Sequence, residues 1–295
     1  MHAECDIVTP FIIDSLDSRG RIARLDDAIN NILTPHDYPE PVAHLVAQVT
    51  TLTAMLGSAL KIDGRFSIQI RSDGPISLIV CDFKSPNQLR SSATFNKDKI
   101  PESNKLSNLL GKGVLTLIAD QNAKVPLYQA IVELEGDNLS DIAEKYYTQS
   151  EQIPTQIKLT SGLAIDSKTG EKKWRSGGFL LQYLPYSSEN RKTQATIENW
   201  NEAKILSETL SDSELLDFEN LSTNQLLFRL YNQYEVRVFD PIKMENKCNC
   251  NHERVTELFS KLSNEELEQY TEDGKINIEC QFCRSKYEFI PKGKE

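Results

Sequence analysis

The chain has 295 residues, of which 39% are hydrophobic and 26% are charged, and its formal net charge is −10 at pH 7. These values exclude a wholly disordered or collagen-like chain and allow one large domain or two to three smaller ones with a buried core. No segment approaches the run of about 18 apolar residues that a membrane-spanning helix needs, and the N-terminus lacks a secretory signal. We therefore expect a globular cytoplasmic protein that does not bind membranes, and its acidity disfavours nucleic acid as a partner.

Residues 1–186 are predicted to form an α+β domain in which strands dominate and helices pack on a face or an edge. A first helix is expected over residues 24–33, ended by Thr34-Pro35, and a longer one over residues 42–60. Apolar residues of the longer segment recur at three- and four-residue steps, which places them on one helix face. These residues are Val42, Leu45, Val46, Val49, Leu52, Leu56 and Leu60.

Alternating apolar residues indicate the strands of this domain. The alternation occurs on both sides of the turn Ser72-Asp73-Gly74-Pro75, which predicts two antiparallel strands. The alternating residues are Phe66, Ile68 and Ile70 before the turn and Ile76, Leu78 and Val80 after it. Further strands are expected over residues 114–119, 128–134, 156–163 and 179–184. A helix over residues 139–147 is expected to begin at Asp137 or Asn138 as its N-cap.

Residues 187–240 are predicted to form a linker, which we term the acidic helical segment. Ten acidic and five basic residues give it a net charge of −5, half of that of the whole chain. Its apolar residues lie on short predicted helices separated by Ser211-Asp212 and Ser222-Thr223-Asn224. One interpretation is an ordinary helical subdomain. The other is a weakly stable segment whose apolar face must be covered by another domain.

Residues 241–295 predict a small domain with two helices and a hairpin. Asn251 is placed to cap the first helix, and Ser263 with Glu266 has the pattern of a capping box for the second, whereas Leu262 continues the apolar face of the first. A turn is expected at residues 272–274. The hairpin strands are expected around Ile276, Ile278, Tyr287 and Phe289.

Four of the six cysteines fall in this small domain, at a spacing typical of a metal site. Cys248 and Cys250 form one pair, Cys280 and Cys283 form the other, and 29 residues separate the pairs. Two such pairs brought together make a tetrahedral all-sulfur site, which favours a zinc ion (Zn²⁺) over an iron–sulfur cluster. His252 is near enough to compete as a ligand, but four cysteines fill the shell, so we expect it at the surface of the helix start.

The chemistry of a four-cysteine zinc shell allows two roles. Such a shell leaves no position open for water or substrate, and a purely structural zinc that holds a small module together is the first interpretation. A redox switch is the second, because the C-x-C pair abuts a helix N-terminus, where the helix dipole and the metal favour the thiolate that oxidants attack. Zinc contributes on the order of 10 to 16 kcal/mol to the folding of such modules. Its loss is therefore expected to unfold the module, loosen the acidic helical segment and uncover apolar surface that binds unfolded chains.

Other motifs extend along nearly the whole chain. They include Arg19-Gly20-Arg21, His36-Asp37-Tyr38-Pro39, Ser72-Asp73-Gly74-Pro75, Leu134-Glu135-Gly136-Asp137, Gly177-Gly178 and Asp240-Pro241. Together with the four cysteines, they resemble the redox-regulated holdase chaperones of the heat shock protein 33 family.

The resemblance implies a cytosolic stress-response chaperone that works without ATP and is inactive when reduced and zinc-bound. It implies that oxidation releases zinc and forms the disulfides Cys248 to Cys250 and Cys280 to Cys283. The small domain and the linker would then unfold, and the protein would form a homodimer that binds unfolding client proteins. Cys81 lies outside the motif and is expected to be buried, whereas no role is expected for Cys5.

An enzyme is not expected. The chain has no phosphate-binding loop, and the histidines His2, His36, His44 and His252 are not placed beside an evident nucleophile. Two other classes stay open. A thiol-disulfide oxidoreductase could use the pair Cys280 and Cys283, although no thioredoxin-like βαβ pattern surrounds it. A zinc-ribbon nucleic-acid module is the other, although residues 241–295 carry nine basic and eleven acidic residues.

Overall fold

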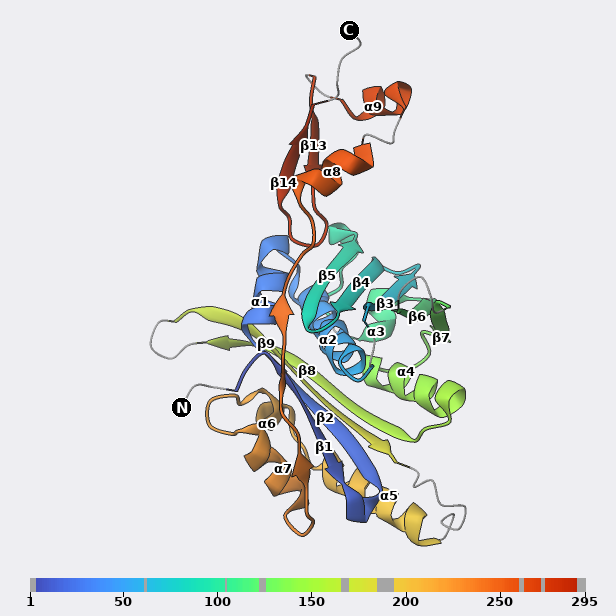
Figure 1. Cartoon of the computed structure of the whole chain (residues 1–295), viewed down its shortest axis with the longest axis vertical. Coiled ribbons are helices and arrows are strands. Elements are labelled where there is room, and N and C mark those ends of the chain that lie inside the picture. Colours follow the sequence, from blue (N-terminus) through green and yellow to red (C-terminus); the bar gives the residue numbers. More distant parts are fainter. Residues whose placement is uncertain are drawn as a thin grey trace. The chain divides into compact units, whose positions relative to one another are not determined.

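The computed structural model describes residues 4–60, 63–103, 105–121, 126–165, 170–184, 194–259, 263–271 and 274–290. Its contacts divide the chain into two compact units, Met1–Asn246 and Lys247–Glu295. The first unit combines two sheets with helices, and the second combines a hairpin with two short helices (Figure 1). The predicted α+β class, with a sheet-rich N-terminal region, is confirmed.

Two sheets form the frame of the first unit. The first sheet has the order β10-β1-β2-β9-β8, and β11 also pairs with β1. These strands are β1 (Ile7–Ile13), β2 (Ser18–Leu25), β8 (Thr155–Ile165), β9 (Lys172–Tyr183), β10 (Arg237–Val238) and β11 (Ile242–Lys243). The second sheet has the order β12-β5-β4-β3-β6-β7. Its strands are β3 (Arg65–Ser72), β4 (Ile76–Lys84), β5 (Gln88–Phe95), β6 (Gly113–Asp120), β7 (Tyr128–Glu133) and β12 (Glu245–Asn246).

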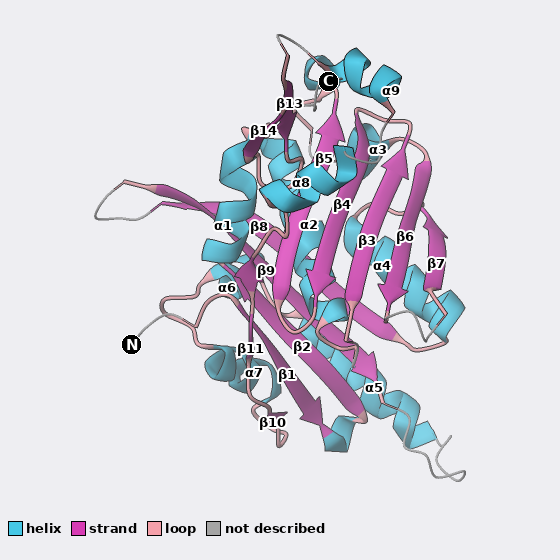
Figure 2. Ribbon diagram, turned by 45° about the horizontal axis from the view of Figure 1, so that its top comes forward, coloured by secondary structure: helices cyan, strands magenta, loops and turns pink. Residues whose placement is uncertain are grey.

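The helix α2 (Glu40–Gly57) packs against strands of both sheets (Figure 2). Its apolar residues from Val42 to Leu56 are buried, as the helical spacing predicted, whereas Leu60 lies beyond the helix end and is exposed. Smaller helices complete this core: α1 (Asp27–Leu33), α3 (Leu106–Leu110) and α4 (Leu139–Tyr146). Asn138 is the N-cap of α4, because its Oδ1 accepts a hydrogen bond from the backbone N–H of Asp141 at 3.0 Å.

The helix predicted over residues 24–33 is wrong at its start. Arg24 and Leu25 belong to β2, which pairs with β1 on one side and β9 on the other, and the helix begins at Asp27. The ladder hydrogen bonds and burial on both sides outweigh the local helical pattern. The strands β1, β2 and β5 were not predicted, whereas the strands expected between residues 66 and 184 are present.

Cys81 lies on β4 with no exposed surface, as expected. Burial raises the pKa of its thiol to about 12, so at pH 8 little reactive thiolate is present. We predict that iodoacetamide at pH 8 leaves Cys81 unmodified in the native protein and modifies it once the chain is unfolded in urea. Peptide mass mapping checks this result, and rapid native modification of Cys81 would contradict the buried position.

The acidic helical segment contains three helices among its described residues: α5 (Gln194–Glu208), α6 (Asp212–Leu216) and α7 (Thr223–Tyr231). Ser211 with Glu214 and Ser222 with Gln225 form capping boxes at the starts of α6 and α7. These caps lie at the two breaks that the sequence predicted.

The second unit holds α8 (His252–Phe259), α9 (Asn264–Tyr270) and a hairpin of β13 (Ile276–Glu279) and β14 (Lys286–Phe289). Asn251 Oδ1 accepts a hydrogen bond from the backbone N–H of Arg254 at 2.8 Å, and Ser263 with Glu266 caps α9, so both predicted caps are confirmed. Leu262 and most of the turn expected at residues 272–274 lie outside the described residues. Among the described helices, none is both long and apolar enough to span a bilayer.

Candidate metal centre and the covered face of the first sheet

The structure brings the four predicted cysteines together. The sulfur atoms of Cys248, Cys250, Cys280 and Cys283 all lie within 4.8 Å of one another, and each side chain is half-buried. The Sγ atoms are 3.7 Å apart between Cys248 and Cys280 and 3.2 Å apart between Cys250 and Cys283. In a tetrahedral zinc site with Zn–S bonds of about 2.3 Å, the sulfurs are about 3.8 Å apart. The cluster therefore has the ligand set and the size that fit a zinc ion.

Local backbone structure positions the two cysteine pairs. Cys280 follows β13 and Cys283 precedes β14, and the turn closes because the backbone N–H of Arg284 donates to the carbonyl of Cys280 at 2.8 Å. Arg284 adopts a left-handed φ of 58°, which reverses the chain direction within the turn. Cys250 lies just before Asn251, the N-cap of α8. Cys280 and Cys283 thus lie between the two strands of the predicted hairpin, which is confirmed.

As free thiols, Cys250 and Cys283 do not ionise alike. Burial raises the pKa of Cys250 to about 12, and its hydrogen bond to Cys283 adds to the rise. Burial also acts to raise the pKa of Cys283, but hydrogen bonds from Ser285 and from the thiols of Cys250 and Cys280 outweigh it and lower that pKa to about 7. Cys283 is therefore favoured over Cys250 as the thiolate when no metal is bound, and thiolates are the form that binds zinc and reacts with oxidants.

Tyr287 supports the cluster from β14, a role that the sequence did not reveal. Its hydroxyl donates a hydrogen bond to Cys250 Sγ at 3.1 Å. Groups that hydrogen-bond to metal ligands orient them, and losing one typically lowers metal affinity 10- to 100-fold. We predict that Tyr287→Phe lowers zinc affinity roughly tenfold, whereas Tyr270→Phe, on an exposed residue of α9, leaves it unchanged. Competition with a chromogenic chelator measures both affinities, and equal values for the two variants would exclude the role of Tyr287.

His252 is exposed and lies outside the cysteine cluster. Its Nδ1 is 3.2 Å from the hydroxyl oxygen of Thr256, one turn further along α8. The expectation of a surface position at the helix start is confirmed.

His44 lies beside a serine that is distant in sequence, which corrects the expectation that no histidine adjoins a nucleophile. On α2, its Nδ1 is 2.9 Å from Ser161 Oγ of β8, and its Nε2 is 3.5 Å from a carboxylate oxygen of Glu40. The Ser161 hydroxyl also donates to the backbone carbonyl of His44 at 3.3 Å, so its oxygen can accept a hydrogen bond from Nδ1–H. These hydrogen bonds hold α2 against β8. The hydrogen of the Ser161 hydroxyl is used in its bond to the backbone carbonyl of His44. Sequence alone did not suggest the contact because 117 positions separate the two residues.

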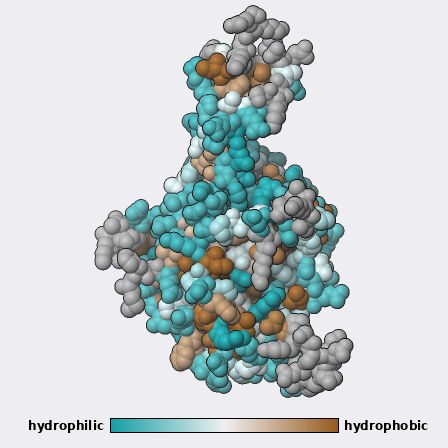
Figure 3. Space-filling view, in the orientation of Figure 1, coloured by the Kyte–Doolittle hydropathy of each residue, from teal (hydrophilic) through white to brown (hydrophobic). Residues whose placement is uncertain are grey.

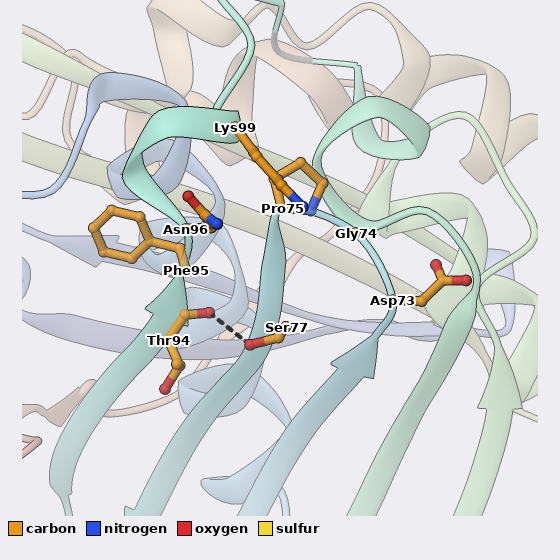
Figure 4. Close-up of a pocket in the computed structure, with 8 residues that line it drawn as sticks. All are labelled: Asp73, Gly74, Pro75, Ser77, Thr94, Phe95, Asn96 and Lys99. Atoms are coloured by element: carbon orange, nitrogen blue, oxygen red, sulfur yellow. Dashed lines mark hydrogen bonds between the residues drawn. The ribbon is translucent and has the colours of Figure 1, made fainter.

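A pocket of about 390 Å³ opens at the ends of β4 and β5 (Figure 4). Its polar lining includes Asp73 and Lys99, and Ser77 donates a hydrogen bond to the carbonyl of Thr94 at 3.3 Å. The Asp73 carboxylate accepts from the backbone N–H of Lys112 at 2.6 Å, which joins the turn between β3 and β4 to the residue before β6. The side chains that line this pocket do not pair a nucleophile with a base.

The first sheet carries an apolar face that the acidic helical segment covers. We term it the covered face, and it comprises Phe11, Ile13, Ile22, Phe179 and Leu181. The helices of the segment and the connections between them supply the opposing side chains, which include Leu210, Leu215, Leu221, Leu226, Leu227 and Tyr231. Figure 1 shows α6 and α7 on the side of the first sheet that does not hold α2, and α6 contacts β8 and β9. The apolar face of the segment is thus covered by the first sheet, which lies in the same compact unit.

Little of this apolar surface is accessible while the segment is in place. Phe11, Ile13, Ile22, Phe179 and Leu181 are each at most 1% exposed. Figure 3 shows apolar residues on the drawn face of the first unit in small groups within a hydrophilic surface. Removing the segment would join the residues of the covered face into one accessible patch.

Comparisons with known proteins agree over nearly the whole length. The family model described as Hsp33 protein matches residues 6–290. The 33 kDa chaperonin of Caulobacter vibrioides strain NA1000 / CB15N is 36% identical over 295 residues, covering 98% of this chain and 96% of that relative. The 33 kDa chaperonin of Escherichia coli O17:K52:H18 is 33% identical over 282 residues, covering 95% and 90%. The crystal structure of the 33 kDa chaperonin from Thermotoga maritima superposes with a TM-score of 0.77 at 21% identity, covering 97% of this chain and 95% of that one, and so shares the fold.

Proposed function

Because this chain belongs to the Hsp33 family of chaperones, we propose that it is a redox-regulated holdase that binds unfolding proteins without ATP. The observation that carries the proposal is the pairing of two features in one chain. A four-cysteine cluster offers a metal site whose ligands are sensitive to oxidants, and an apolar face is covered by an acidic segment with a net charge of −5 by residue count.

In the resting state, the four cysteines would hold a zinc ion as thiolates. When bound, the ion supplies cross-links that a module with a small core needs to stay folded. Oxidation takes two electrons from each pair of thiolates and forms one disulfide per pair. With hydrogen peroxide as oxidant, two peroxide molecules and four protons would yield four water molecules as the two disulfides form, and the disulfide sulfurs would no longer hold a zinc ion. The proposed pairs are Cys248 with Cys250 and Cys280 with Cys283.

Loss of the metal uncouples the parts of the chain in turn. We assign residues 1–186 to client binding and dimerisation, residues 187–240 to the linker and residues 241–295 to the redox switch. The switch domain unfolds first, the acidic helical segment then leaves the covered face, and apolar residues such as Phe11 and Phe179 become available to clients. The oxidised protein forms a homodimer in the cytoplasm, and nucleic acid and membranes are not partners.

Light scattering of an unfolding client tests the proposal. Peroxide-treated protein is expected to suppress client aggregation, and the reduced zinc-bound protein is expected not to. A parallel titration with oxidant should release zinc and increase the binding of an apolar dye together. Equal suppression by both forms, or by neither, would overturn the switch.

The same samples distinguish the other classes. An oxidoreductase would turn over a disulfide substrate catalytically, and a zinc ribbon would bind a fluorescent oligonucleotide at physiological salt. We expect only stoichiometric thiol chemistry and no oligonucleotide binding.

A further inference from the structure

Arg24 is buried on the face of the first sheet that the acidic helical segment covers. It lies on β2 two residues after Ile22, on the same side of the strand, and its side chain has no exposed surface. One guanidinium nitrogen donates to the backbone carbonyl of Leu221, and the other terminal nitrogen donates to the carbonyl of Glu214 at 3.3 Å. Its Nε has no hydrogen-bond partner among the described residues. The partners of this buried cation therefore come from the acidic helical segment.

A second arginine faces the same part of the segment. Arg175 lies on β9, and its guanidinium donates to the Glu219 carboxylate at 2.8 Å and to the Asp26 carboxylate at 3.4 Å. Both arginines contact the ring of Phe218, whose centroid is 5.4 Å from Cζ of Arg24 and 5.3 Å from Cζ of Arg175. Phe218 is only 2% exposed.

This contact has a definite chemistry. An aromatic ring attracts a guanidinium to its face, and the attraction grows when water is excluded. A carboxylate next to the ring pairs with an arginine that presents several donors in a fixed geometry. The dipeptide Phe218-Glu219 offers both groups, so two arginines of the sheet bind one aromatic ring and one acidic side chain.

We propose that Arg24 and Arg175 form a receptor for an aromatic residue next to an acidic one. Phe218-Glu219 fills this receptor while the segment is docked, and a client segment of the same chemistry fills it after release. The inference rests on the proposed function and names the client sequences that the covered face prefers.

The positive charges of Arg24 and Arg175 disfavour two other kinds of client segment, the aliphatic and the basic. An aliphatic segment would bury Arg24 again without a ring and without a nearby carboxylate, which carries a desolvation cost. A basic segment would add like charge to the same site. The covered face should therefore bind client segments that contain an aromatic residue next to an acidic one, and it should discriminate against aliphatic and basic segments.

Two labelled peptides test the receptor on the oxidised full-length chain. One has the sequence of residues 214–221, and the other carries Phe218→Leu and Glu219→Lys in the same sequence. Fluorescence anisotropy is expected to show at least tenfold tighter binding of the first peptide. The preference should fall below threefold in the Arg175→Gln protein and stay unchanged in Arg65→Gln, a half-exposed arginine of the second sheet.

The outcomes separate the receptor from the chaperone activity. If oxidised protein suppresses client aggregation but binds both peptides equally, the receptor is wrong and the proposed function stands. If it binds the first peptide selectively but does not suppress aggregation, the receptor stands and the proposed function fails. If it does neither, both fail. The peptide comparison uses the unsubstituted protein, so it decides the matter even where Arg175→Gln does not fold.

Discussion

Replacing Cys280 by serine is expected to remove the metal and unfold residues 247–295 in the reduced protein. A serine hydroxyl does not ionise at neutral pH and is a poor zinc ligand, so three thiolates remain. Zinc contributes on the order of 10 to 16 kcal/mol to the folding of small zinc modules, more than many whole domains gain on folding. Among the described residues of the second unit, only Leu267 and Ile276 are buried apolar residues. So small a core cannot replace the stabilisation that the metal supplies.

Metal analysis and hydrogen exchange measure the two parts of this result. The variant should contain no zinc after gel filtration, and the amides of β13 and β14 should lose their protection from exchange. By the proposed coupling, it should also suppress client aggregation without oxidant. Cys248→Ser should likewise lose zinc and amide protection, whereas Cys5→Ser, outside the cluster, should keep its zinc. Full zinc content in both cluster variants would disprove the metal centre.

The cysteine cluster was predictable because each pair is local in the sequence. A C-x-C pair and a C-x-x-C pair restrict the sulfurs to short turns, so only their mutual approach had to be inferred. The hydrogen bond from Tyr287 was not predictable, because it depends on which face of β14 the side chain occupies. The same limit applies to His44, whose contact with Ser161 exists only after α2 packs on β8.

The fold shows the same division between local and distant information. The face of α2 and the strands on either side of residues 72–75 follow from periodicity alone. Arg24 and Leu25 carry a helical pattern but lie in β2, because pairing with β1 and β9 decides their conformation. Arg24 also could not be assigned a function, since its partners Glu214 and Leu221 are 190 and 197 positions away.

Replacing Gly177 by alanine is expected to weaken the docking of α6 without changing the acidic helical segment itself. Gly177 pairs with Arg24 across β2 and β9, and Leu215 of α6 lies directly over it. An added Cβ would be 2.7 Å from Leu215 Cγ and 3.0 Å from its carbonyl oxygen. Overpacking of this kind typically destabilises the folded state by about 1–3 kcal/mol. Here the strain is relieved when α6 moves off the sheet. The reduced zinc-bound variant should therefore suppress client aggregation in part, with faster hydrogen exchange in residues 211–217.

Two glycines nearby serve as controls for this effect. Gly178 is the next residue of β9 and faces the opposite side, where a Cβ would be 2.7 Å from Met55 Cε and 2.8 Å from Thr51 Cγ2. Gly178→Ala should lower the stability of the core around α2 and leave α6 docked. Gly162→Ala meets only Leu216, at an ordinary contact of 3.4 Å, and should change neither property. If Gly178→Ala activates the reduced protein as strongly as Gly177→Ala, then activity follows general destabilisation. Activation by Gly177→Ala alone would instead show that contact between α6 and the first sheet keeps the reduced chaperone inactive.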